Sequence, residues 1–155
     1  MRSARAIEIT LVDPRTPQVA ALVRELDRYM TGLYPAESNH LVDLDTLARP
    51  DVRFFAVRSG NETMGCGAIM LKEVYAEVKR IYVSPRARGL GLAKLILARL
   101  EQEARSLGLR LMRLETGTLQ PEALSLFAGM GFAPRGPFGD YPADDPYSVF
   151  MEKEL

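Results

Sequence analysis

The residues whose types and spacing most clearly suggest a chemical role are the arginines and glycines between Ser84 and Ala93. This segment reads Ser-Pro-Arg-Ala-Arg-Gly-Leu-Gly-Leu-Ala, and it joins a predicted strand ending at Val83 to a predicted helix. The first N–H groups of a helix lack internal partners and lie at the positive end of its dipole. Gly89 and Gly91 allow the backbone to approach a bulky anion closely. The segment therefore predicts a phosphate or pyrophosphate site.

The charge around this segment supports that prediction. No acidic residue lies between Glu77 and Glu101, whereas six basic residues do: Lys79, Arg80, Arg86, Arg88, Lys94 and Arg99. The whole chain has 20 basic and 20 acidic residues, so the bias is local. Nucleic-acid binding relies on a broadly basic surface, and we expect no nucleic-acid partner for a formally neutral chain.

Two common phosphate-binding patterns do not fit the segment. A dinucleotide-binding fingerprint needs a third glycine where this chain has Lys94, and the residues around Lys94 do not match the end of a Walker-type loop. The pattern that fits is Arg-x-x-Gly-x-Ala, at Arg88, Gly91 and Ala93. It resembles the acetyl-CoA pyrophosphate loop of the GNAT N-acetyltransferase superfamily.

The resemblance extends over nearly the whole chain. Residues 82–85 match the family's strand end and proline-containing turn, residues 120–123 fall where the family often has Asn-x-x-Ala, and Gly131-Phe132 matches its Gly-Phe. The resemblance implies acetyl-CoA as the co-substrate. We expect no metal, because a single histidine, His40, cannot form a metal site alone and no ligand cluster surrounds it. It assigns coenzyme binding to Ile81, Tyr82, Val83, Arg88, Gly89, Leu90, Gly91, Leu92, Ala93, Gln120 and Phe127.

The resemblance also implies how the pantetheine arm lies. It should pair with backbone groups of Ile81 and Val83, and the strand after Gly108 should splay away to admit it. The backbone N–H near Ile81 or Tyr82 is then the expected group that polarises the thioester carbonyl.

Glu77 is our candidate base, because direct transfer to an amine requires that the amine lose a proton. It lies six residues before Val83, where some members of the family carry a catalytic glutamate. The alternative is a sheet-surface carboxylate paired with Lys79 or Arg80, because charge pairs along strands are common.

The proton donor for the departing thiolate is less clear from the sequence. Many members of the family have a tyrosine where this chain has Phe127, which has no proton to give. Tyr141 is our candidate acid, with Tyr82, Tyr147, water or an unassisted thiolate as open alternatives. Cys66 lies between two glycines in a predicted strand, and we expect a buried side chain rather than an acyl-cysteine.

The acceptor pocket of this fold usually involves the first helix, the loop after it and the last strand pair. Tyr29, Tyr34 and His40 are therefore our candidate substrate-binding residues. From Gln120 onward the chain has six acidic and two basic residues, and an acidic rim would attract a cationic amine, although a solvated loop is the simpler interpretation. A small-molecule amine and a peptide amine both remain open as acceptors.

The spacing of apolar residues predicts the elements that position these groups. Strands are expected over residues 6–12, 53–58, 63–72, 77–83, 110–116, 132–135 and 147–153, and helices over 17–33, 43–49, 93–107 and 121–130. On the third helix, Glu101 is expected to face away from the apolar stripe. The fold class is α/β (α+β): a GNAT-like mixed, mostly antiparallel central sheet of six to seven strands flanked by about four helices.

The composition sets the remaining expectations. A length of 155 residues with 47% hydrophobic residues suits a single domain over 1–155, and one cysteine excludes an internal disulfide. We find no signal peptide and no membrane-spanning run, so we expect a cytoplasmic protein without a membrane partner. The sequence leaves open whether the protein forms a homodimer.

The leading hypothesis is an N-acetyltransferase acting in a ternary complex; a non-catalytic acyl-CoA sensor and a nucleotide-binding module are the alternatives.

Overall fold

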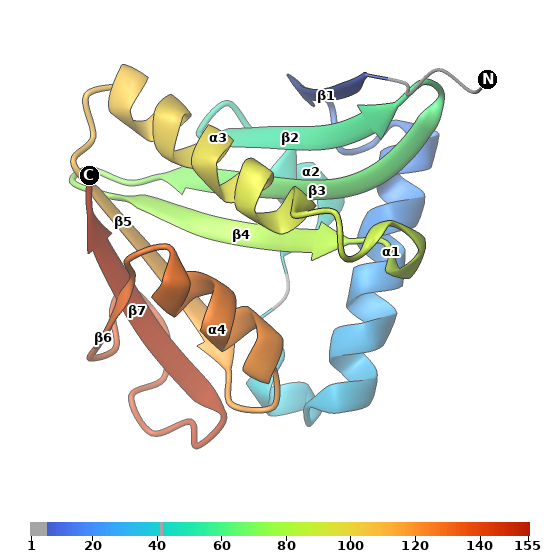
Figure 1. The fold of residues 1–155 in the computed structure, drawn as a ribbon. Coiled ribbons are helices and arrows are strands. Elements are labelled where there is room, and N and C mark those ends of the chain that lie inside the picture. Colours follow the sequence, from blue (N-terminus) through green and yellow to red (C-terminus); the bar gives the residue numbers. More distant parts are fainter. Residues whose placement is uncertain (1–5, 41) are drawn as a thin grey trace.

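A seven-stranded sheet runs through the computed structural model, which describes residues 6–40 and 42–155 (Figure 1). The strand order is β1-β2-β3-β4-β5-β7-β6, and every neighbouring pair is antiparallel except β4 and β5. The strands are β1 (Ile7–Leu11), β2 (Val52–Ser59), β3 (Glu62–Leu71), β4 (Ala76–Val83), β5 (Leu111–Gly117), β6 (Ala133–Arg135) and β7 (Ser148–Glu154). Residues 1–5, within the segment considered for a signal peptide, lie outside the described residues.

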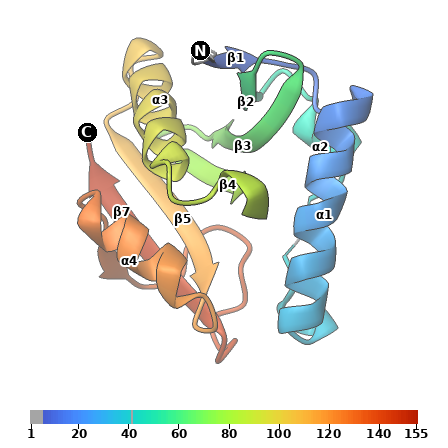
Figure 2. The ribbon, with the colours of Figure 1, turned by 45° about the vertical axis from the view of Figure 1, so that its right-hand side comes forward.

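Helices cover both faces of this sheet, as Figure 2 shows. They are α1 (Pro17–Leu33), α2 (Leu44–Leu47), α3 (Leu92–Ser106) and α4 (Pro121–Gly129), with short 3-10 turns η1 (Ala36–Ser38) and η2 (Pro85–Ala87). The mixed, mostly antiparallel sheet and the four α-helices confirm the predicted fold class. None of these helices is long and apolar enough to cross a bilayer.

Two hydrophobic cores result from this arrangement. Along β2, Phe55 and Val57 face the core under α3 and α4, whereas Phe54 and Ala56 face the core under α1 and α2. Successive side chains of a strand point to opposite faces, so a strand covered on both sides must be apolar at every position. The apolar run from Phe54 to Val57 therefore follows from the cover that β2 has on both faces.

The parallel contact between β4 and β5 is short. It consists of two residue pairs, Ala76 with Met112 and Glu77 with Arg113. Beyond Glu77 the two strands diverge, and β5 pairs with β7 over its full length (Figure 1). This divergence was expected from the GNAT resemblance, and it opens the sheet at its centre.

One prediction about α3 was wrong. Glu101 was expected to face solvent, but it is buried, and Lys153 of β7 donates a 2.7 Å hydrogen bond to its Oε1 atom. Arg105 lies 3.9 Å from the other carboxylate oxygen. The helical pattern alone could not reveal a cation on a strand 52 residues away.

The packing of α3 on β3 gives a test of the fold. A Cβ at Gly67 would lie 2.5 Å from Cγ2 of Ile96, a fully buried side chain. Gly67→Ala should therefore lower the free energy of unfolding by about 1–3 kcal/mol, because overpacking forces neighbours to shift. Urea denaturation measures the change.

The matched control is Gly32→Ala. Gly32 lies within α1, and a Cβ there has no neighbour within 4 Å. Alanine is favoured over glycine in a helix by about 1 kcal/mol, so this variant should be neutral or more stable. Equal stability of the two variants would contradict the close approach of α3 to the sheet.

Candidate functional site

A cavity lies where β4 and β5 diverge. Val78 to Ile81 of β4 and Leu114 to Gly117 of β5 form two of its walls. Side chains of α1, of α4 and of the loop before β7 complete it, including Met30, Phe127 and Tyr147. The cavity therefore joins segments far apart in the sequence, and it reaches from the sheet centre to the C-terminal end of β5.

The glycine-bearing loop between η2 and α3 adopts the conformation that its sequence suggested. Gly89 and Gly91 have φ values of 85° and 73°, which glycine adopts without strain. No side chain caps the first turn of α3, so its leading N–H groups remain available. A Cβ at either glycine would have no neighbour within 4 Å, which leaves open space beside the loop.

Most of the basic residues around this loop are already paired. Arg80 binds Asp27, Lys79 binds Glu77, Arg86 binds Glu62 and Arg99 binds Glu103. Arg88 and Lys94 have no ion pair within residues 6–40 and 42–155, and Arg88 donates a 3.3 Å hydrogen bond to the carbonyl of Val83. The local positive bias is therefore much smaller than the sequence suggested.

The residues assigned to the coenzyme divide into two groups. Ile81, Gln120 and Phe127 line the cavity itself. The others lie outside its lining: Tyr82, Val83, Arg88, Gly89, Leu90, Gly91, Leu92 and Ala93. Tyr82 packs against α1, where its hydroxyl donates to Glu25 at 2.8 Å, and burial raises its pKa to about 12.

Glu77 and Tyr141 are in direct contact. The Tyr141 hydroxyl donates a 2.5 Å hydrogen bond to Oε2 of Glu77, and Lys79 donates both to that hydroxyl and, at 3.0 Å, to the same carboxylate oxygen. Burial, followed by the charge of Glu77, raises the pKa of Tyr141. Tyr141 and Lys79 line the cavity. Glu77, 4% exposed, does not line it but lines, together with both of them, a second cavity.

Arg80 marks a bulge in β4. Its φ of 60° is unusual for a residue with a side chain and costs of order 1–3 kcal/mol. Its guanidinium group binds Asp27 of α1 at 2.5 Å and the carbonyl of Val42 at 2.8 Å. These contacts hold the strained backbone and neutralise the Arg80 charge at the cavity wall.

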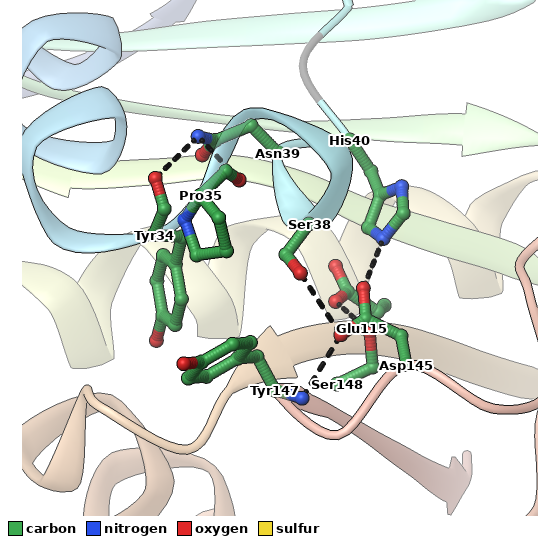
Figure 3. Close-up of polar contacts among 9 residues, drawn as sticks. All are labelled: Tyr34, Pro35, Ser38, Asn39, His40, Glu115, Asp145, Tyr147 and Ser148. Carbon is green, nitrogen blue, oxygen red and sulfur yellow. Dashed lines mark hydrogen bonds and ion pairs between the residues drawn. The ribbon is translucent and has the colours of Figure 1, made fainter.

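His40 belongs to a network that joins two loops across the mouth of the cavity (Figure 3). Its Nε2 atom lies 3.2 Å from Oδ2 of Asp145, and Ser38 donates to the other carboxylate oxygen at 3.0 Å. The backbone N–H of Tyr147 also bonds Asp145 and lowers the pKa of its carboxyl. Of the acidic residues expected to form a rim, Asp145 alone is in this network, and its side chain is only 6% exposed.

The two tyrosines assigned to the substrate differ in position. The ring of Tyr34 covers Gly117, and its hydroxyl accepts from the Leu119 N–H and donates to Gln120, both at 3.1 Å. A Cβ at Gly117 would lie 1.8 Å from that hydroxyl, so only glycine allows this contact. Tyr29 is 46% exposed and does not line the cavity.

Glu115 was missed by the sequence analysis, although it lines the cavity. It alternates in β5 with the buried residues Leu114 and Thr116, and the Ser148 hydroxyl donates to its Oε2 atom at 2.9 Å. Burial raises the pKa of Glu115. The available signal was a carboxylate near the end of the strand expected to splay from β4.

Cys66 is fully buried in β3, and its thiol donates to the Arg80 carbonyl at 3.3 Å. Burial raises the pKa of the thiol to about 12. Nucleophilic cysteines have lowered pKa values, so the expectation of a buried side chain is confirmed.

Comparison with known proteins identifies the family. The model of the "Acetyltransferase (GNAT) family" matches residues 19–132. An IAA acetyltransferase of Azospirillum brasilense is 49% identical to this chain over 151 residues, which cover 96% of this chain and 98% of that protein. The uncharacterized N-acetyltransferase YsnE of Bacillus subtilis is 36% identical and covers 96% and 100% of the two chains. The chain therefore belongs to the GNAT acetyltransferase family, a class of acyl-CoA-dependent transferases.

Solved structures agree with this assignment. A crystal structure of a proposed acyl-CoA N-acyltransferase from Klebsiella pneumoniae superposes with a TM-score of 0.81 at 36% identity, covering 96% of this chain and 97% of that one. PaiA N-acetyltransferase from Thermoplasma acidophilum, solved with coenzyme A, has a TM-score of 0.75 at 18% identity, covering 97% and 99%. The second likeness concerns the fold alone.

The position of Tyr34 gives a test of the site's construction. Tyr34→Phe removes the acceptor of the Leu119 N–H, so the free energy of unfolding should fall by about 1–2 kcal/mol. Tyr29→Phe is the matched control, because the exposed Tyr29 hydroxyl has no recorded partner and its loss should change stability by less than about 0.5 kcal/mol. Equal losses, measured by urea denaturation, would show that the Tyr34 hydroxyl does not hold the chain after β5.

Proposed function

We propose that this protein is an N-acetyltransferase that transfers the acetyl group of acetyl-CoA to a primary amine within a ternary complex. The divergence of β4 from β5 beyond Glu77 carries the proposal, because it leaves one edge of β4 without a strand partner beside a cavity. An extended chain with amide groups, such as pantetheine, can pair with such an edge in the way that peptides add to sheets. The backbone of Ile81 and Val83 would then hold the pantetheine arm.

The loop before α3 supports the placement of the pyrophosphate. Its two glycines and the uncapped first turn of a 15-residue helix favour a doubly charged anion. So do the cations Arg88 and Lys94, which have no ion pair among the described residues. The acyl end would then point along β4 toward the acceptor side of the cavity. A backbone N–H near Ile81 or Tyr82 is in this proposal the donor to the thioester carbonyl oxygen, whose negative charge grows during attack.

Residues of α4 and of its preceding turn would complete the coenzyme site. Gln120 and Phe127 line the cavity, and Phe127 packs edge-on against Phe132, with ring centres 5.8 Å apart. Phe127 supplies an apolar wall for the thiol, but it has no proton to donate to the departing thiolate. The acid must therefore come from another element.

In this proposal Glu77 and Tyr141 act as one proton-transfer unit. The Tyr141 hydroxyl and the Lys79 ammonium group both line the cavity and both contact the Glu77 carboxylate, so they can carry a proton between the cavity and that carboxylate. A thiolate expelled into a cavity of low polarity is a stronger base than in water, which offsets the raised pKa of the Tyr141 phenol as its proton donor. Lys79, bonded to the same hydroxyl, would replace that proton.

The coenzyme loop can be tested with a pair of glycine variants. Gly91→Val should abolish stabilisation by acetyl-CoA in a thermal-shift assay, because a side chain at φ 73° distorts the loop and fills the space beside it. Gly108→Val is the control, because Gly108 has a φ of 82° and open surroundings at the other end of α3. It should be destabilised similarly but keep acetyl-CoA binding. Equal coenzyme affinity in both variants, or stabilisation of the wild type by ATP instead, would refute the placement.

The proton-transfer unit predicts non-additive effects. Glu77→Gln and Tyr141→Phe should each lower kcat by about 10- to 100-fold and leave acetyl-CoA affinity unchanged, because neither side chain lies at the coenzyme loop. The double variant should lose no more than the worse single variant, because the two groups act together. Rates of thiol release across an amine panel measure this. Multiplying losses would indicate separate roles, and a wild-type rate for Glu77→Gln would exclude it.

A further inference from the structure

Glu115 differs from the other carboxylates near the cavity in having unused hydrogen-bonding capacity. Asp145 is bonded to His40, Ser38 and a backbone N–H, and Glu77 is bonded to Tyr141 and Lys79. Glu115 receives one recorded hydrogen bond, from Ser148 to Oε2, and has no cation within 4.0 Å in the described parts of the chain. Its carboxylate lies beside the loop network in Figure 3.

The charged and titratable groups around Glu115 come from three segments of the chain. His40 lies after η1, Lys79 in β4, Asp145 in the loop before β7 and Tyr141 in the same loop. Burial is the largest influence and raises the pKa of Glu115; Ser148, His40 and Lys79 oppose it, and Asp145 adds to it. A carboxylate whose pKa is raised is a better base, and a base is most effective when its pKa lies near the working pH.

We propose that Glu115 binds the ammonium group of the acceptor and takes the proton that this group must lose before it attacks the thioester. The inference rests on the proposed function and adds the residue that receives the acceptor. Glu115 can contact the acceptor directly because it lines the cavity, whereas Glu77 does not line this cavity.

The protons and bonds of the step balance. The ammonium ion gives one proton to Glu115, and the neutral amine forms a C–N bond to the acetyl carbon. When the C–S bond breaks, its electron pair leaves with sulfur. The second proton lost by nitrogen passes to the group formed by Glu77, Tyr141 and Lys79, which gives one proton to the thiolate through Tyr141. Glu115 returns its own proton to water after the amide departs.

The charges of the cavity also limit the class of acceptor. Arg80 is paired with Asp27, Lys79 with Glu77 and Asp145 with His40, so Glu115 is the one charged cavity group that lacks an ion partner in the described residues. The Nε atom of Arg80 has no hydrogen-bond partner among those residues either, but the charge of the guanidinium group is paired with Asp27. A buried charge is stable only when it is paired. One ammonium group on the acceptor is therefore enough to pair the charge of Glu115.

Part of the cavity wall is apolar. Leu26, Met30 and Val42 line it, together with the ring of Tyr147. The acceptor inferred from this wall and from Glu115 is a primary monoamine with an apolar body. A second charge, such as the carboxylate of an amino acid, would find no free partner and would bind poorly.

The test measures kcat/KM against pH with acetyl-CoA and three amines: 2-phenylethylamine, benzylamine and hexylamine. For the wild type, kcat/KM should be level between the pKa of Glu115 and that of the amine, and it should fall at lower pH as Glu115 becomes protonated. For Glu115→Gln it should be about 10²–10⁴-fold lower near neutral pH and rise about tenfold per pH unit, because only free amine then reacts. A merely structural role would give the same deficit at every pH.

Ser148→Ala supplies a second readout. The Ser148 hydroxyl bonds the ionised form of Glu115, so its loss should raise the pKa of that carboxyl and move the acid limb to higher pH. Acetyl-CoA affinity, measured by calorimetry, should be unchanged in both variants. An unmoved acid limb, or a parallel loss at every pH in Glu115→Gln, would overturn the inference while leaving the transferase function intact.

Acceptor preference completes the test. Phenylalanine is 2-phenylethylamine with an added carboxylate, and its kcat/KM should be at least about tenfold lower, one unpaired charge costing more than about 1.4 kcal/mol. A preference for phenylalanine would overturn the assignment of a monoamine. Absence of turnover with every amine, despite acetyl-CoA binding, would overturn the proposed function together with the inference.

Discussion

The limited pairing between β4 and β5 is the constraint on which the rest of the site depends. Two residue pairs hold the strands together, and beyond Glu77 each strand follows a different partner: β4 stays with β3, and β5 stays with β7. Parallel strands that separate in the middle of a sheet leave unpaired backbone groups, which are costly when buried. A ligand that pairs with them removes that cost. The proposed coenzyme would thus take the place of a strand partner between β4 and β5.

The charged residues around the opening keep it in shape. Arg80 holds β4 to α1 through Asp27, and Asp145 holds the loop before β7 to the segment after α1 through Ser38 and His40. These contacts join the two sides of the cavity, which come from opposite ends of the chain. Because most of its charges are satisfied internally, the cavity offers few unpaired groups to a ligand. Its selectivity then depends on single residues, as argued for Glu115.

Local sequence patterns were sufficient for most of the fold. The strands and the four α-helices follow from periodicity and turn chemistry, and the structure confirms them. The short turns η1 and η2 were not predicted, because three residues carry too little pattern. For the site, the sequence indicated Glu77, Tyr141 and His40. It did not indicate that Tyr141 donates a hydrogen bond to Glu77, that Tyr29 is exposed or that Glu115 lines the cavity.

The sequence by itself determined the family, the order of elements and the glycine-bearing loop, because these depend on residue types within a few positions of one another. The tertiary structure decided which charges are neutralised. Arg80 meets Asp27, Lys153 meets Glu101 and His40 meets Asp145 across 53, 52 and 105 positions of the chain, and no local pattern records such distances. Charge pairing acts through space over a few ångströms. The opening of the sheet thus could be foreseen from family resemblance, whereas the free carboxylate within it required the folded chain.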